Sequence, residues 1–204
     1  MTEIVKGNEI DSVKKAASVL KKGGIIVYPT ETLYGIGTTA LDDASVERVF
    51  NVKGRPYGKP IPVLVKDKEM LAEYVEVNKK ASILIERFLP GPLTIVLRER
   101  KEFPKLISAG SKKIAVRISR HPFVMNLFNF IDFPITSTSA NISGDRNLLE
   151  FNQILETFNE KVDLIVDSGN IPPSKGSTIV DLTTDPPQIL REGDIKKEEL
   201  EELL

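Results

Sequence analysis

Hydrophobic residues recur at the spacing of a helix, about 3.6 residues, in several stretches of the chain. In the first stretch Ile10, Val13, Ala17 and Leu20 share one face, and Gly23-Gly24 ends the expected helix. The later stretches follow residues that cap helices, or begin with Pro122 at a first helical position. The expected helices start at Asn8 or Glu9, Asp42, residue 67, Asn78, Pro122, close to Phe151, and at Asp194.

Apolar runs of strand length alternate with these helices. The run IIVY at 25–28 has no strongly polar position, which is typical of a strand buried on both faces, and the segment 29–37 after it reads as a polar loop. Further strands are expected in IPVLV, LTIVLRER, IAVRIS, PITSTS, VDLIVDSG, STIVDL and PQILRE. Some strands follow one another with no helix between, as after Gly176. This order predicts an α/β fold with an open mixed sheet and helices on its faces, in one domain over residues 1–204.

Composition narrows the functional classes. The chain has 204 residues, 41% of them hydrophobic, which is enough to bury a full core. It has no cysteine, so disulfides, thiolate catalysis and Cys-ligated metals are excluded. The net charge of -1 does not imply a polyanionic partner, although a local basic patch can still bind one. No apolar run is long enough to span a membrane and no signal-peptide pattern begins the chain, so we expect no membrane contact and a cytoplasmic location.

Polar side chains gather where the expected strands end. They lie at 30–34, 53–59, 117–121, 139–141 and 174–177, and Arg191 ends the last strand. Hydroxyls, an amide and several cations suit a site for a nucleotide phosphate and a small polar molecule. The segment KGRPYGKPIP at 53–62 places three cations within seven residues, among Gly and Pro. It is either a stiff loop that receives an anion or a solvated turn.

Several familiar sites are missing. There is no GxxxxGK[ST], since SKGST at 174–178 has its lysine before the glycine, and YGIG is only a fragment of a dinucleotide motif. No zinc-ligand spacing is present, so no metal-ligating residue is expected. His121 is the only histidine and is either a general base or a helix-start residue. Glu31 is either a base or a turn residue, and Ser139 lacks the sequence context of a serine hydrolase.

Taken together and in this order, the segments resemble the YrdC family of threonylcarbamoyl-AMP synthases. The resemblance covers nearly the whole chain, and the joint occurrence of its segments is highly specific. The matching segments are YPTETLYGIG (28–37), KGRP (53–56), LPGPLTIVL (89–97), VRISRHP (116–122), TSANISG (138–144), VDLIVDSG (162–169), STIVDL (177–182) and ILREG (189–193). The resemblance implies a twisted, open α/β sheet with a large basic concave face.

The resemblance also implies a reaction. ATP, L-threonine and bicarbonate (or CO2) give L-threonylcarbamoyl-AMP and pyrophosphate, with Mg2+ arriving on ATP. A separate tRNA threonylcarbamoyl-transferase complex then uses the product to form N6-threonylcarbamoyladenosine next to the anticodon. The ATP-binding residues carried over are Lys53, Arg55, Asn141 and Arg191, of which Lys53 and Arg55 are also the catalytic pair. Lys59 is added to the ATP-binding residues because, although it departs from the family, its side chain could still reach a phosphate. The threonine-binding residues carried over are Thr32, Tyr34, Arg117, Ser139 and Ser177.

Some positions depart from the family pattern. Lys59 stands where many members have Asn, and Leu64 stands where they have His, so one threonine contact is expected to be lost or supplied elsewhere. The segment GDRNLLE lacks the usual Ser-Pro-Thr, which puts a nucleotide contact near Leu149 in question. Because the sequence ends near Leu204, it is expected to be the single-domain form of the family.

Two other functions remain open from the sequence. One is a module that binds tRNA or double-stranded RNA without turnover, supported by Lys and Arg at 53–59, 98–105 and 112–120 but lacking aromatic stacking residues among them. The other is carbamoyl transfer from carbamoyl phosphate, as in the related domain of the hydrogenase maturation factor, whose acylphosphatase and zinc-finger segments are missing here. Residues 170–176, rich in Pro, Gly and Ser, are expected to be mobile.

Overall fold

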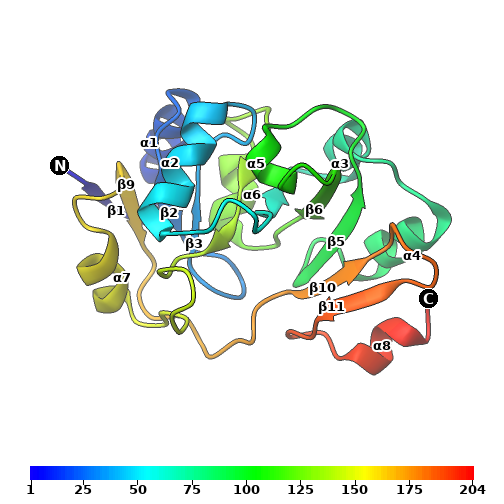
Figure 1. The fold of residues 1–204 in the computed structure, drawn as a ribbon. Helices are drawn as coiled ribbons and strands as arrows, with labels where there is room; N and C mark the ends of the chain where they lie inside the picture. The colour runs from blue at the N-terminus through cyan, green and yellow to red at the C-terminus, as the bar shows by residue number, and fades with distance from the viewer.

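Two mixed β-sheets lie side by side in the computed structural model, which describes residues 1–204 (Figure 1). The first sheet has the order β1 (Glu3–Lys6), β9 (Leu164–Asp167), β2 (Ile26–Tyr28), β3 (Gly35–Gly37) and β8 (Thr138–Ser139). The second has the order β11 (Gln188–Arg191), β10 (Thr178–Asp181), β5 (Leu93–Arg98), β6 (Lys113–Arg117), β4 (Val63–Leu64) and β7 (Ile135–Thr136). The mixed α/β fold expected from the sequence is confirmed, with the strands divided between two sheets.

The two sheets are joined where β3 leads toward β7. Thr38 donates its backbone N–H to the Thr136 hydroxyl at 3.0 Å, and the Thr136 N–H bonds to the Thr38 carbonyl at 2.9 Å. A single bridge between Thr39 and Ile135 extends the contact. The backbones approach so closely that a Cβ on Gly37 would lie 1.9 Å from the Thr136 carbonyl oxygen, so only glycine fits there. We call these residues the seam between the sheets.

Eight helices surround the sheets. They are α1 (Ile10–Lys21), α2 (Asp43–Lys53), α3 (Lys68–Tyr74), α4 (Lys79–Phe88), α5 (Lys105–Ser108), α6 (Pro122–Leu127), α7 (Phe151–Phe158) and α8 (Lys197–Glu201). Asp42 and Asn78 cap α2 and α4 as expected, each accepting a bond from a backbone N–H of the first turn. None of the helices is both long enough and apolar enough to pass through a lipid bilayer.

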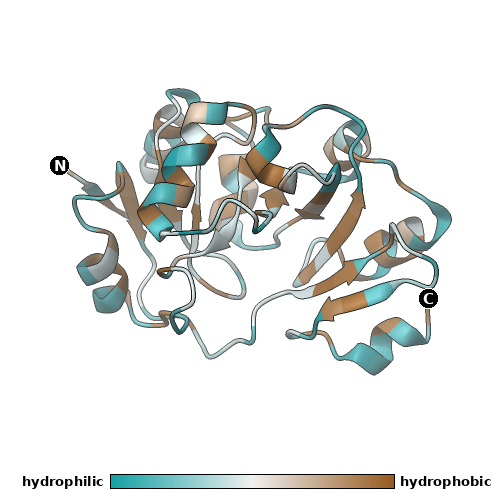
Figure 2. Cartoon of the chain, in the orientation of Figure 1, coloured by the Kyte–Doolittle hydropathy of each residue, from teal (hydrophilic) through white to brown (hydrophobic).

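The hydrophobic core continues from one sheet to the other. One cluster of buried side chains contains Val27 and Ile36 of the first sheet together with Ile95 and Val180 of the second. A smaller cluster packs the other face of β2 against α1 and α6. Strand β2 is therefore buried on both faces, which explains its unbroken apolar run. Figure 2 shows hydrophobic strands inside and hydrophilic outer faces on the helices.

Several local expectations were wrong. The segment 29–37 is not loop throughout, because its last three residues form β3. Helix α2 runs on to Lys53, so this lysine belongs to a helical turn and not to the loop after it. Asp194 does not cap α8; its carboxylate accepts bonds from the Ser174 hydroxyl at 2.7 Å and the Lys175 N–H at 2.9 Å. Strand β1 and helix α5 were not expected at all.

Candidate functional site

A cleft of about 430 Å³ is lined by residues of both sheets and of the loop after α2. The first sheet and its loops contribute mainly hydroxyls, and the second contributes most of the charged groups. Four of the five charged residues in the lining are cations. The polar lining residues are Thr30, Thr32, Tyr34, Arg55, Thr94, Ser111, Lys113, Arg117, Ser137, Thr138, Ser139, Asn147, Ser177, Asp181 and Arg191.

The residues that form the floor of the cleft are set by the two-residue alternation of side chains along a strand. In β6, Lys113, Ala115 and Arg117 line the cleft, whereas Ile114 and Val116 between them belong to the core. Strands β5 and β10 show the same alternation. Because successive side chains of a strand point to opposite faces, a single polar residue in an apolar strand marks a position on the floor. That signal was present in the sequence at Thr94, which sequence reasoning missed.

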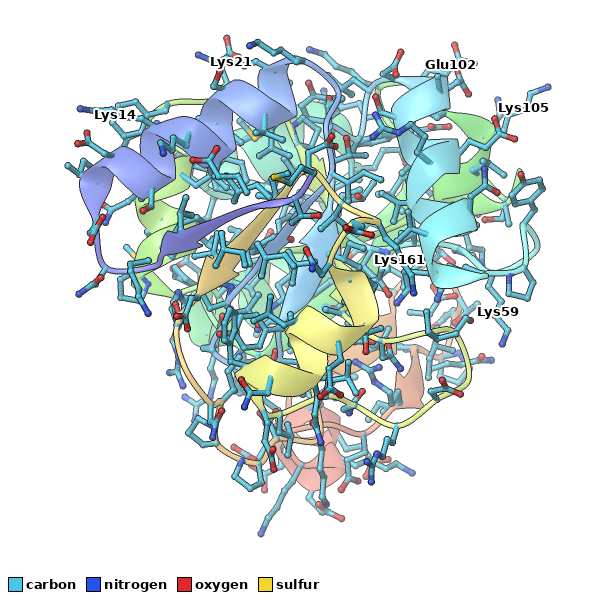
Figure 3. The ribbon with its side chains drawn as sticks, turned by 90° about the vertical axis from the view of Figure 1, so that its left-hand side faces the viewer. Lys14, Lys21, Lys59, Glu102, Lys105 and Lys161 are labelled. Atoms are coloured by element: carbon cyan, nitrogen blue, oxygen red, sulfur yellow. The ribbon has the colours of Figure 1, made fainter.

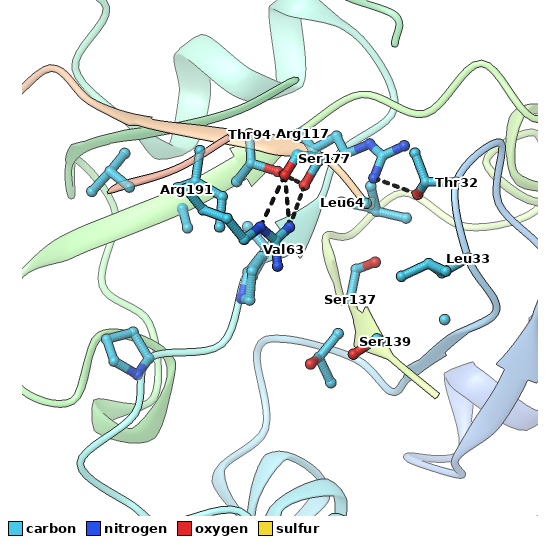
Figure 4. Close-up of a pocket in the computed structure, with 18 of the residues that line it drawn as sticks. Thr32, Leu33, Val63, Leu64, Thr94, Arg117, Ser137, Ser139, Ser177 and Arg191 are labelled. Atoms are coloured by element: carbon cyan, nitrogen blue, oxygen red, sulfur yellow. Dashed lines mark hydrogen bonds between the residues drawn. The ribbon is translucent and has the colours of Figure 1, made fainter. Parts of the chain in front are cut away.

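One end of the cleft is built around Arg117. Its Nε donates to the Gly91 carbonyl at 3.0 Å, and its Nη1 donates to the Thr32 hydroxyl at 3.2 Å (Figure 4). Its Nη2 lies 3.0 Å from Oε1 of Glu31 but is buried without a hydrogen-bond partner. The guanidinium is thus held by Gly91, Thr32 and Glu31, and Arg117 lines the cleft in this fixed orientation.

Arg191 reaches the same end of the cleft. Its Nη2 donates to the Ser177 carbonyl at 2.7 Å and lies 3.2 Å from the Ser177 hydroxyl, which shares a 2.8 Å bond with the Thr94 hydroxyl (Figure 4). Burial lowers the pKa of Arg191, and the charge of Arg117 lowers it further, so the two guanidinium groups affect each other. The structure therefore brings Arg191, predicted to contact the nucleotide, together with Ser177 and Arg117, predicted to contact threonine.

Lys53 is directed away from the cleft. Its side chain is buried, and Nζ donates to the carbonyl oxygens of Ser139 at 2.5 Å and Asn141 at 2.7 Å, with the Asn141 side-chain oxygen at 3.3 Å. Burial lowers the pKa of Lys53 to about 7, with a smaller contribution from the charge of Arg55. Asn141 also lies outside the lining, and its amide donates to the Asp145 carbonyl. Only Ser139, hydrogen-bonded to Asn141 at 2.7 Å, reaches the cleft from this group.

Arg55 and Lys59 lie in different surroundings although only three residues separate them in the sequence. Arg55 lines the cleft and is folded onto its own loop, donating to the Lys59 carbonyl at 3.1 Å and the Pro60 carbonyl at 2.6 Å. Lys59 is exposed, is not part of the lining, and lies at the edge of the molecule in Figure 3. The basic segment thus sends a single cation into the cleft.

Tyr34 lines the cleft, but its hydroxyl is already bonded within the protein. It donates to the Gly169 carbonyl at 2.8 Å and accepts from the Ser168 N–H at 2.9 Å. Burial raises the pKa of Tyr34 to about 12, so the phenol stays neutral. The residue joins the loop after β2 to the loop after β9. Leu64, also in the lining, is fully buried and offers an apolar surface at its position.

The far end of the cleft contains an ion pair that the sequence did not reveal. Lys113 Nζ lies 3.2 Å from Asp181 Oδ2, and Asp181 is the lining's only carboxylate. Burial alone would raise the pKa of Asp181, but the Thr183 hydroxyl and N–H and the Lys113 charge hold it below its ordinary value. No local motif indicates this pair, because its members come from strands separated by β5.

His121 stands at the start of α6, which confirms the second of the two interpretations given for it. Its Nδ1 accepts the Phe123 N–H at 3.2 Å, it caps α6, and it does not line the cleft. No group of three or more His, Asp or Glu side chains is arranged to hold a metal ion.

The chain is similar to known proteins in both sequence and structure. The family Sua5_yciO_yrdC, described as "Telomere recombination", matches residues 18–193. The threonylcarbamoyl-AMP synthase of Pyrococcus abyssi is 36% identical over 193 residues, covering 94% of this chain and 57% of the relative. A putative threonylcarbamoyl-AMP synthase of Methanocaldococcus jannaschii is 37% identical over 191 residues, covering 92% of this chain and 90% of the relative.

Solved structures show the same fold. The crystal structure of P. abyssi Sua5 complexed with L-threonine superimposes with a TM-score of 0.93 at 35% identity, covering all of this chain and 61% of the other. Escherichia coli YciO gives a TM-score of 0.88 at 28% identity, covering 96% of this chain and 98% of the other. The chain thus spans about three fifths of the Pyrococcus protein and nearly all of YciO.

Proposed function

Because the chain belongs to the Sua5/YciO/YrdC family, we propose that it is an L-threonylcarbamoyladenylate synthase, a nucleotidyltransferase that acts on ATP, L-threonine and bicarbonate. The observation that carries the proposal is that most of the predicted site residues line the same cleft. Seven of the ten residues predicted to bind ATP or threonine line it, namely Thr32, Tyr34, Arg55, Arg117, Ser139, Ser177 and Arg191. A P. abyssi relative has been crystallised with L-threonine, which supports an amino acid as one ligand.

The cleft suits a reaction that joins two anionic ligands. The threonine amine attacks CO2, or bicarbonate with loss of water, and gives a carbamate. A carbamate oxygen then attacks the α-phosphorus of ATP, and the bond to the leaving pyrophosphate breaks. The protein needs few proton-transfer groups for these steps, because its main task is to hold the anions together and balance their charge.

The residues divide this task between two parts of the cleft. Arg117, Thr32 and Ser177 would hold the threonine carboxylate and hydroxyl, since they line one end of the cleft with a guanidinium and two hydroxyls. Arg55 and Ser139 would face the phosphates. Arg191, which is bonded to Ser177, would lie between the two ligands, where the negative charge of the carbamate meets that of the α-phosphate.

The partners follow from the product. Threonylcarbamoyl-AMP is an activated acyl donor, so we propose that a tRNA threonylcarbamoyl-transferase complex in the cytoplasm consumes it. Mg2+ would be bound by the ATP phosphates and would neutralise part of their charge. Direct contact of this chain with tRNA or double-stranded RNA stays a prediction, which salt-dependent RNA binding would support.

Pyrophosphate release tests the proposed reaction. The protein is incubated with ATP, Mg2+ and bicarbonate together with each amino acid in turn, and the adenylate is identified by mass spectrometry. We expect release that requires both threonine and bicarbonate, with serine as the closest substitute. Release that is independent of threonine, or no release at all, would contradict the proposal. Salt-dependent RNA binding under the same conditions would then favour the RNA-binding function.

A further inference from the structure

Glu31 lies behind the threonine end of the cleft and takes no part in the residue roles proposed above. Its side chain is 9% exposed and is not among the lining residues. Oε1 lies 3.0 Å from Arg117 Nη2 and accepts the Arg120 N–H at 3.1 Å, while Oε2 accepts the Ser119 hydroxyl at 2.5 Å. These contacts fix the carboxylate against the side of Arg117 that faces away from ligands.

Glu31 is ionised in this position. Burial alone would raise its pKa, but the charge of Arg117, the Ser119 hydroxyl and two backbone contacts together hold the pKa of Glu31 below its ordinary value. Two further titratable side chains lie near Glu31, and neither supplies a competing cation. Burial raises the pKa of Tyr28, so its phenol stays neutral. Burial lowers the pKa of His121, and its Nδ1 accepts a hydrogen bond. The carboxylate charge is therefore directed at Arg117.

The net charge at this end of the cleft is that of one cation. Arg117 and Arg191 contribute two positive charges, and Glu31 removes one from behind. An amino acid presents one carboxylate to such a site, whereas phosphate and the terminal groups of ATP present two or more negative charges. Both kinds of ligand must reach the same cleft, so this end has to prefer the carboxylate although phosphates are present.

We propose that Glu31 determines specificity: its charge keeps the Arg117–Arg191 end of the cleft selective for a single carboxylate over phosphate dianions. The inference rests on the proposed function, because it takes threonine as the ligand of this end. A dianion gains about twice as much as a monoanion from any added positive charge, since Coulomb energy is proportional to ligand charge. Removal of the Glu31 charge should therefore favour phosphate over threonine by about tenfold.

Equilibrium binding of two probes tests the proposal without turnover. L-Threonine and inorganic phosphate are each titrated by calorimetry into the wild type and into Glu31→Gln, and competition shows that they share a site. Gln keeps the size and one acceptor oxygen for Ser119 or Arg120 but lacks the charge. The expected result is a roughly tenfold fall in the ratio of phosphate Kd to threonine Kd.

Two further variants separate charge from geometry. Glu31→Asp keeps the charge on a shorter side chain and should keep the ratio within about twofold of wild type. Glu102→Gln makes the same chemical change at an exposed position outside the cleft lining and should leave the ratio unchanged. Thermal unfolding checks that each variant is folded.

The outcomes distinguish the inference from the function on which it rests. A wild type that binds no threonine contradicts the proposed function, and with it the role of Glu31. A wild type that binds threonine, with an unchanged ratio in Glu31→Gln, overturns only the role of Glu31. The same ratio in Glu31→Asp and Glu31→Gln also overturns it, because the carboxylate would then act through its shape and not its charge.

Discussion

Two groups of cations in this protein look alike in the sequence and differ in the fold. Arg117 and Arg191 end strands β6 and β11, and both guanidinium groups reach the cleft. Lys53, Arg55 and Lys59 crowd into one short segment, yet only Arg55 lines the cleft. Lys53 is buried against backbone carbonyls, and Lys59 is exposed at the edge. A dense run of cations is therefore a poorer guide to a site than isolated cations at strand ends.

The difference lies in what holds each side chain. Arg117 is fixed by Gly91, Thr32 and Glu31 in an orientation that lines the cleft, so it meets a ligand without rearranging. The Nζ of Lys53 donates its hydrogen bonds to the turn at 139–141, and these bonds would have to break before Lys53 could contact a phosphate. In the structure Lys53 acts on the cleft indirectly, through the position of Ser139.

Arg117→Ala should have the largest effect. It removes the proposed carboxylate contact and leaves Glu31 buried without its counter-ion, which costs about 3–5 kcal/mol of the free energy of unfolding. Threonine binding should fall at least about a hundredfold. Denaturant titration and calorimetry measure the two effects. Adding Glu31→Gln to Arg117→Ala should restore part of the stability but none of the threonine binding. Unaltered threonine binding in Arg117→Ala would contradict the view that the strand-end cations form the site.

Lys53→Met should destabilise the fold more than any change at Arg55 or Lys59. It leaves the carbonyls of Ser139 and Asn141 without their buried donor, at a cost of about 3 kcal/mol. The expected loss of activity follows from displacement of Ser139. Denaturant titration of Lys53→Met beside Lys59→Met, which makes the same change on the surface, provides the check. Equal stabilities would show that Lys53 does not hold the turn.

The pH dependence of stability should carry the signature of Lys53. Its pKa of about 7 in the fold lies below 10.5, its ordinary value, so the unfolded chain binds more protons between these values. The contribution of this residue to the free energy of unfolding therefore rises with pH across that window. From about pH 7 to about pH 9 the wild type should gain about 1–2 kcal/mol relative to Lys53→Met. A constant difference would mean that Lys53 titrates normally.

Arg55→Ala should weaken ATP binding without weakening the fold. Its guanidinium lines the cleft and bonds only to its own loop, so we expect about a tenfold to hundredfold rise in KM for ATP. The free energy of unfolding should change by less than about 1 kcal/mol. Kinetics with ATP as the varied substrate separates this result from Lys53→Met, whose main effect is on stability. A change in the KM for threonine alone would contradict the assignment.

Lys59→Ala should have the smallest effect of the series. Its side chain is exposed and outside the cleft lining, so stability should change by less than about 0.5 kcal/mol and the KM for ATP by less than about threefold. The same assays apply. A tenfold change in KM would show that the 53–62 loop moves Lys59 onto bound phosphate.

The sequence predicted those parts of the fold and site that depend on local signals. Caps at Asp42 and Asn78, the doubly buried strand β2, and polar strand ends at Thr32, Arg117 and Ser177 were all visible in short stretches of residues. In each case the neighbouring residues decide the conformation, so spacing was sufficient.

Other features depend on partners far along the chain. The direction of the Lys53 side chain is set by carbonyls more than eighty residues away, at Ser139 and Asn141. The Lys113–Asp181 ion pair forms across β5, and no sequence motif in β6 or β10 indicates it. The roles of the site residues toward ATP and threonine came from family resemblance and remain predictions.

The seam between the sheets limits how the cleft can change its width. Its walls come from different sheets, and these sheets are joined by backbone contact at Gly37 and Thr136, where no side-chain atom fits between them. Because the two backbones are in direct contact at the seam, the sheets cannot approach each other more closely there. We therefore expect a bulkier substrate to be accommodated by a change in the loop at 53–62, which lines the cleft, while the spacing of the two sheets sets an upper limit on ligand size.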